Sequence, residues 1–209
     1  MKRFTMALLA LVLTLGVAQS SAAVRVVFMG DSITRLFGSN RPKFFSENEF
    51  SCKGTDGQTT KTMLGRFQND VINAKPEVVV IGAGTNDIAK NDGTYVLVEQ
   101  IYANIVKMAE MAKEAGIKVV LTTTMPAEAY WFGKDGYTKP TIAVPRLNNM
   151  LMEYAANNDC GWIDYYSMFA TPTGKFDERW SYDDCHPQEW TYDVIIETIM
   201  SVLEPMLNE

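Results

Sequence analysis

Residues 78–82 read Val-Val-Val-Ile-Gly, a nearly continuous apolar run that ends at a glycine. A strand in the middle of a parallel sheet is covered on both faces, so it has apolar side chains on both sides. Further β-rich runs recur along the chain, and helical patterns separate them. The runs cover Val24–Met29, Glu49–Lys53, Val78–Gly82, Lys118–Thr123 and Trp162–Tyr165. This alternation predicts one three-layer α/β/α domain with a mostly parallel sheet.

Between the runs, apolar residues recur three or four positions apart, as expected for helices that pack on a sheet. Gly116 is expected to end one helix, and Pro145 is expected near the start of the next. The last helix is predicted from about Thr191 to Leu207. We interpret these aliphatic and methionine stripes as core. They lie at Met63–Val71, Val98–Ala112, Leu147–Tyr154 and Ile195–Met206.

Composition excludes several classes of function. The 209 residues are 47% hydrophobic and 21% charged, which is typical of a globular domain. The net charge of −6 argues against a nucleic-acid-binding surface. His186 is the only histidine, and the cysteines lack C-x-x-C spacing, so no metal centre is expected. No cofactor is expected either.

The N-terminal segment has the pattern of a signal peptide. Lys2 and Arg3 precede a run of twelve mostly apolar residues, and small residues follow up to Ala23. A membrane-spanning helix needs about 20 apolar residues, so a stable anchor is not favoured. The sequence predicts a signal peptide over residues 1–23, a single domain over residues 24–209, and a protein exported to the periplasm or the extracellular space.

Polar residues follow the predicted strands at the edge where parallel sheets bind ligands. Ser32 comes directly after the first strand and could expose its hydroxyl there; the alternative is a helix cap. Gly57 lies in a glycine-containing turn after the second strand, and Asn86 follows the third. Asn86 offers an amide donor, and the alternative is a turn cap. Asp87 stands where a dinucleotide-binding loop needs its third glycine, so nucleotide binding is rejected.

His186 lies just before the last helix, three residues after Asp183. A carboxylate one turn away can hydrogen-bond the imidazole and set its tautomer, as a base that assists a serine requires. Asp184 is less favoured, because the side chain at that position would usually diverge from the ring. Taken alone, this histidine could equally be a structural or surface residue.

The strand-end segments together resemble the SGNH (GDSL-type) hydrolase superfamily over the whole mature chain. The matching segments are Gly30-Asp31-Ser32, Gly54–Gly57, Gly84-x-Asn86-Asp87 and Asp183-x-x-His186-Pro187. The resemblance implies a flavodoxin-like five-stranded parallel sheet of order 2-1-3-4-5. It also implies Ser32 as nucleophile, Asp183 and His186 as the rest of the triad, and Ser32, Gly57 and Asn86 as donors to the oxyanion.

The expected reaction is therefore carboxylic ester hydrolysis through an acyl-enzyme, and the favoured substrate is an acetylated carbohydrate or a small ester. Tyr130, Trp131, Trp180 and Tyr182 are candidate substrate-binding residues, although each could simply pack its loop. A lysophospholipase or thioesterase is the alternative. A non-catalytic carbohydrate-binding protein is less favoured, because it gives no reason for Ser32, Asn86, Asp183 and His186 to occur together.

In the implied topology, Cys52 and Cys185 both lie at the carboxyl edge of the sheet, whereas Cys160 lies at the opposite pole. If a disulfide forms, it is expected to join Cys52 to Cys185 and to tether the histidine loop. The alternative is three unpaired thiols. The sequence does not determine the oligomeric state.

Overall fold

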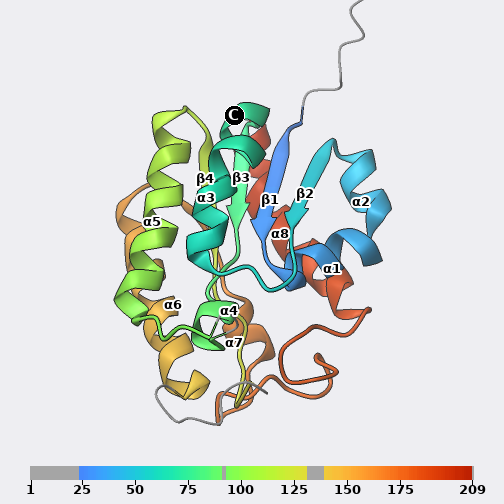
Figure 1. The fold of residues 1–209 in the computed structure, drawn as a ribbon. Helices are drawn as coiled ribbons and strands as arrows, with labels where there is room; N and C mark the ends of the chain where they lie inside the picture. The colour runs from blue at the N-terminus through green and yellow to red at the C-terminus, as the bar shows by residue number, and fades with distance from the viewer. Residues whose placement is uncertain (1–23, 91–92, 131–138, 209) are drawn as a thin grey trace, which may run out of the picture.

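The computed structural model describes residues 24–90, 93–130 and 139–208. Its sheet is parallel and has the strand order β2-β1-β3-β4-β5, so the predicted fold and order are confirmed (Figure 1). The predicted signal peptide, residues 1–23, lies outside the described residues. The strands are β1 (Val26–Gly30), β2 (Phe50–Gly54), β3 (Val78–Ile81), β4 (Lys118–Thr122) and β5 (Gly161–Ile163).

Helices cover both faces of the sheet and complete three layers (Figure 1). No helix in these described ranges is long and apolar enough to cross a bilayer. The helices are α1 (Ser32–Asn40), α2 (Pro42–Glu47), α3 (Thr60–Asp70), the 3₁₀ turn η1 (Ile72–Ala74), α4 (Thr85–Ile88), α5 (Val98–Glu114), α6 (Pro140–Asn157), α7 (Tyr165–Phe169) and α8 (Thr191–Leu207).

The core consists of two clusters, one on each face of the sheet. Helices α3, α5 and α6 bury their apolar stripes on one face. Helices α1, α2, α7 and α8 cover the other face. There, Phe28 of β1 packs among aromatic rings of α1 and α2, and Tyr192 of α8 stacks on Phe37 with ring centroids 5.3 Å apart. Strand β1 is therefore buried on both sides and forms a rigid base for the residues that follow it.

One helix end lies where the sequence predicts it, and one helix start does not. Gly116 adopts φ +75° directly after α5, and its N–H donates to Lys113 while Ile117 N–H donates to Ala112, so the predicted stop is confirmed. Pro145, in contrast, lies inside α6, which begins at Pro140. The helix starts earlier than predicted because Pro140 also suits a first turn, where no N–H donor is needed.

Cys52, Cys160 and Cys185 are all free thiols, so the structure has the alternative of three unpaired cysteines and not the conditional Cys52–Cys185 disulfide. Cys52 packs against the cluster beneath α1 and α8, where its Sγ donates to the Thr34 carbonyl at 3.2 Å. Cys185 belongs to the cluster on the opposite face. Thiols on opposite faces of a sheet are not within S–S bonding distance. Cys52 and Cys185 were expected at the same edge of the sheet, but their side chains pack on opposite faces.

Candidate active site

Ser32 is placed by the junction between β1 and α1. Asp31 caps the helix, since its Oδ1 accepts a hydrogen bond from Ile33 N–H at 3.0 Å, and Ser32 is the first helical residue. Gly54 of the neighbouring strand lets this helix approach closely, because a Cβ there would overlap the backbone of Thr34 and Arg35. The hydroxyl of Ser32 is therefore presented at the carboxyl edge of the sheet by rigid elements.

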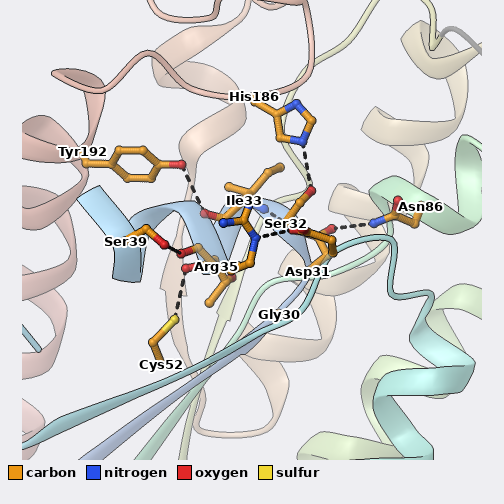
Figure 2. Close-up of polar contacts among 12 residues, drawn as sticks. Gly30, Asp31, Ser32, Ile33, Arg35, Ser39, Cys52, Asn86, His186 and Tyr192 are labelled. Atoms are coloured by element: carbon orange, nitrogen blue, oxygen red, sulfur yellow. Dashed lines mark hydrogen bonds and ion pairs between the residues drawn. The ribbon is translucent and has the colours of Figure 1, made fainter. Parts of the chain in front are cut away.

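Ser32 and His186 meet although 154 positions separate them in the sequence. Ser32 Oγ lies 2.9 Å from His186 Nε2 (Figure 2). On the other side of the ring, His186 Nδ1 lies 2.7 Å from Asp183 Oδ2. The tautomer that suits both contacts carries its proton on Nδ1, so Nδ1–H donates to Asp183 and Nε2 accepts from Ser32. The three groups form one hydrogen-bonded row.

The loop that carries Asp183 and His186 is held by its own polar groups. Asp183 Oδ1 accepts from His186 N–H at 2.6 Å and from Cys185 N–H at 3.1 Å. Ser181 Oγ donates to the His186 carbonyl at 2.8 Å. One carboxylate thus positions both the backbone and the ring of the histidine. An aspartate only three residues before the histidine can therefore orient its imidazole.

Asp184 anchors this loop to two other segments, a role that the sequence did not reveal. Its Oδ2 accepts from Glu128 N–H at 2.8 Å and from Ala129 N–H at 3.3 Å, and its Oδ1 accepts from Phe176 N–H at 3.0 Å. Asp184 also adopts φ +61°, a left-handed conformation that aspartate tolerates better than most residues. No spacing signal marks such a residue, because its partners lie far away in the sequence.

Asn86 lies across from Ser32 and is oriented by Asp31. Asn86 Nδ2 donates to Asp31 Oδ2 at 3.2 Å, which fixes which end of the amide carries the N–H groups (Figure 2). Asp31 is only 3% exposed. Burial raises the pKa of Asp31 to about 6, whereas the nearby His186 and the Ile33 N–H act in the opposite direction.

Asp87 joins the Asn86 segment to the turn that contains Gly57. It is 2% exposed, and it accepts from Thr60 N–H at 2.8 Å and from Thr60 Oγ–H at 2.6 Å. Thr60 begins α3, three positions after Gly57. Gly57 itself has φ +69°, which favours glycine. The relative positions of the two segments are therefore fixed by a buried carboxylate.

These segments enclose a cavity of about 280 Å³. Tyr130 and Tyr182 line it, and the Tyr182 ring stacks on His186 with centroids 5.8 Å apart and planes 13° apart. Trp180 packs instead against Phe169 and Trp190, and Trp131 lies outside the described residues. The cavity is lined by Ser32, Arg35, Leu36, Asp56, Gly57, Thr85, Asn86, Ala89, Tyr130, Tyr182, Cys185 and His186.

The cavity offers acid–base and nucleophilic groups but no evident metal site. Among residues 24–90, 93–130 and 139–208, no group of three or more histidine, cysteine or acidic residues could hold a metal ion. Cys185 also lines the cavity, and burial raises the pKa of its thiol, so this sulfur stays protonated at neutral pH. Ser32 is therefore the better candidate nucleophile, because its hydroxyl contacts His186 Nε2.

A hydroxyl, an imidazole and a carboxylate in one row at the carboxyl edge of a parallel sheet define the class of serine hydrolases. Comparison with known proteins identifies the family. Residues 28–194 match the GDSL-like lipase/acylhydrolase family, and the chain belongs to it. It is a serine ester hydrolase of this family.

Solved structures agree with this assignment. A Bacteroides fragilis NCTC 9343 protein that is predicted to be an acylhydrolase has 39% sequence identity and a TM-score of 0.83, with 88% of each chain covered. A GDSL-like lipase from Bacteroides thetaiotaomicron VPI-5482 has 35% identity and a TM-score of 0.82, with 88% of this chain and 89% of the lipase covered. The acetyl xylan esterase AlAXEase shares the fold at 20% identity, with a TM-score of 0.68 and 85% of this chain and 98% of that chain covered.

A shorter match occurs with YqeF, an uncharacterized lipoprotein of Bacillus subtilis strain 168. The two are 37% identical over 75 residues, which are 35% of this chain. The match spans 31% of the length of YqeF, so it concerns a part of that protein.

Proposed function

We propose that the protein hydrolyses carboxylic esters by transferring the acyl group to Ser32. The observation that carries this proposal is the row from Ser32 Oγ through the His186 ring to Asp183, with contacts of 2.9 and 2.7 Å. Asp183 keeps the Nδ1 proton in place, so Nε2 is the nitrogen that accepts a proton. Ser32 becomes nucleophilic as His186 removes its proton during attack.

In the first half-reaction, Ser32 Oγ bonds to the ester carbonyl carbon, and its proton moves to His186 Nε2. The carbonyl oxygen becomes an oxyanion, which the N–H groups of Ser32 and Gly57 and the Asn86 amide stabilise. When the C–O bond to the alcohol breaks, His186 protonates the leaving oxygen. Water then attacks the acyl-enzyme by the same steps and releases the acid and Ser32.

We further propose that the favoured reaction is the removal of acetyl groups from carbohydrate. A cavity of about 280 Å³ is slightly smaller than the usual range for ligand pockets, roughly 300–1,000 Å³, which suits a short acyl group better than a long chain. The buried side chains of Ala89, Tyr130 and Cys185 line this cavity and leave little room for extension. Tyr182 is 59% exposed beside His186 and offers a ring face to a sugar. The acetyl xylan esterase AlAXEase has the same fold, so this scaffold is compatible with the hydrolysis of acetyl esters on carbohydrate.

Export is the third part of the proposal. Residues 1–23 have the charge and apolar pattern of a signal peptide, and the partly matching YqeF is a lipoprotein. Secretion would bring the enzyme to acetylated polymers outside the cytoplasm. N-terminal sequencing of the protein secreted by its host is expected to start at Val24; a mature protein that still begins at Met1 would contradict export by cleavage.

The catalytic proposal is tested by acetate release from p-nitrophenyl acetate. We expect turnover by the wild type and loss of turnover in Ser32→Ala. Ser39→Ala is a matched control, because Ser39 lies on the same helix and its hydroxyl donates only to the Arg35 carbonyl at 3.1 Å. Equal activity of the wild type and Ser32→Ala would refute the proposed nucleophile.

The acyl preference is tested with p-nitrophenyl acetate, butyrate and octanoate. We expect kcat/KM to fall as the acyl chain lengthens. A preference for octanoate would support the alternative of a lysophospholipase or thioesterase type of acylhydrolase and would contradict the deacetylase proposal.

A further inference from the structure

A second and larger hollow lies beyond the catalytic cavity, between the start of α3, the short helix α4 and the segment that enters α5. Its volume is about 590 Å³, roughly twice that of the catalytic cavity. These elements gather at the carboxyl edge of the sheet (Figure 1). The hollow is lined by Thr59, two positions after Gly57, and by Asp87, next to Asn86. It therefore adjoins the two segments proposed to hold the oxyanion.

The lining of this hollow combines an aromatic ring and the apolar side chains of Val96 and Leu97 with polar side chains. Tyr95 is 47% exposed, and Lys90 Nζ lies 5.7 Å from the centre of its ring. The amides of Gln100 and Asn104 and the hydroxyl of Thr59 also line the hollow. A sugar ring presents a face of C–H groups and an edge of hydroxyls, so it complements an aromatic ring beside amides. A lipid chain would instead require a continuously apolar lining.

The polar floor of the hollow is connected to the catalytic segments by hydrogen bonds. Gln100 Nε2 donates to Asn104 Oδ1 at 3.1 Å, and Asn104 Nδ2 donates to Thr60 Oγ1 at 3.0 Å. Thr60 Oγ1 in turn donates to Asp87 Oδ1 at 2.6 Å. These contacts hold the two amides in fixed orientations before any ligand arrives. Preorganised groups lose less conformational entropy on binding than mobile ones.

We propose that this hollow is a carbohydrate-binding subsite for sugar units that flank the esterified one. The inference rests on the proposed ester hydrolase function and extends it from a single acetylated sugar to an oligosaccharide or polysaccharide. The face of the Tyr95 ring opposite Lys90 supplies the stacking surface, and Gln100 and Asn104 hydrogen-bond the sugar hydroxyls. The acetyl group enters the smaller cavity beside Ser32 while neighbouring units occupy the hollow.

The test compares acetylated tetrasaccharides of xylose, glucose and N-acetylglucosamine with the acetylated monosaccharide of each and with p-nitrophenyl acetate. We expect at least one tetrasaccharide to have a kcat/KM above that of its monosaccharide. Tyr95→Ala and Gln100→Ala are each expected to lower kcat/KM for that tetrasaccharide by about tenfold, mainly through KM. Both variants should hydrolyse p-nitrophenyl acetate as the wild type does, because this ester does not reach the hollow.

Asn157→Ala is a matched control, since Asn157 lines another polar hollow that contains Tyr102 and Tyr154. This variant should leave every substrate unaffected. The subsite is refuted if no tetrasaccharide is preferred over its monosaccharide, or if Tyr95→Ala and Gln100→Ala slow all substrates equally. A wild type that is inactive on p-nitrophenyl acetate would refute the ester hydrolase proposal itself, which distinguishes the two failures.

Discussion

The two regions that meet at the active site are built in different ways. Ser32 follows β1, whose residues Val26–Met29 are at most 3% exposed, and apolar packing on both faces fixes its position. His186 lies in the loop of residues 181–187, which is held mainly by the hydrogen bond that the Ser181 hydroxyl donates and by those that the Asp183 and Asp184 carboxylates accept. The position of the nucleophile thus depends on buried apolar packing, whereas the position of the base depends on a few polar contacts. Substitutions that remove one polar group should therefore act most strongly on the loop.

The largest effect is expected when the loop loses its imidazole. In His186→Ala, no other histidine can replace the base, because the chain has one. We expect kcat for p-nitrophenyl acetate to fall by about 10⁴- to 10⁶-fold. Added imidazole should restore part of the activity, since the substitution leaves space beside Ser32. A variant that keeps wild-type kcat, with an unchanged circular dichroism spectrum, would contradict the role of His186.

Asp183→Asn separates the two functions of the Asp183 carboxylate. The amide oxygen can still accept from the His186 backbone N–H, so the loop is expected to fold. The ring, however, loses the acceptor that holds its Nδ1 proton, and we expect kcat to fall by about 10³- to 10⁴-fold. Steady-state kinetics and the free energy of unfolding should be measured together. A large loss of stability with little loss of kcat would show that Asp183 acts on loop structure alone.

Asp31 lies between β1 and α1, in the buried region that positions Ser32. The pH dependence of its contribution to stability tests that region. Burial raises the pKa of Asp31 from 3.8 to about 6, so folding favours its protonated form. The stability from this group is fully present below pH 3.8 and is lost as pH rises through about 6. The full change is about 3 kcal/mol. Asparagine carries no charge, but it can accept at only one of the two Asp31 oxygen positions and loses the contact with Ile33 or Asn86. We therefore expect the stability of Asp31→Asn relative to the wild type to increase from pH 4 to pH 7.

Denaturant unfolding at both pH values measures this effect. Asp193→Asn is a control of opposite sign, because the Arg41 guanidinium holds the pKa of that exposed carboxyl below its usual value. Stability from Asp193 is present above the unfolded pKa and is lost as pH falls. If Asp31→Asn gains nothing at pH 7 relative to pH 4, burial of this carboxyl does not carry the predicted cost.

The smallest effect is expected from Asp184, which anchors the loop without contacting the triad side chains. Asp184→Ala leaves three backbone N–H groups without this acceptor, and we expect the free energy of unfolding to fall by about 2 kcal/mol. A looser His186 should lower kcat by about tenfold. Asp164→Ala is the matched control, since Asp164 also accepts a backbone N–H, from Ser167 at the start of α7. The control should lose stability but keep kcat; an equal loss of kcat in both would contradict a specific role for Asp184.

The same contrast explains what could be predicted from the sequence. The strand runs and the helix from Thr191 to Leu207 are apolar patterns, and the structure contains them. The spacing of Asp183 and His186 predicted a contact that forms within a single loop. The anchoring contacts of Asp87 and Asp184 could not be predicted, because each depends on backbone groups far away in the sequence. The choice between a Cys52–Cys185 disulfide and three free thiols stayed open for a related reason: the order of strands does not indicate which face Cys52 occupies.

The central claim is that His186 activates Ser32 and no other residue. Mass spectrometry of peptides after treatment with phenylmethylsulfonyl fluoride tests it most directly. We predict a single sulfonyl adduct on the peptide that contains Ser32, lost in Ser32→Ala, strongly slowed in His186→Ala and retained in Ser39→Ala. An adduct on a different residue, or equally fast modification of Ser32 in His186→Ala, would contradict the claim.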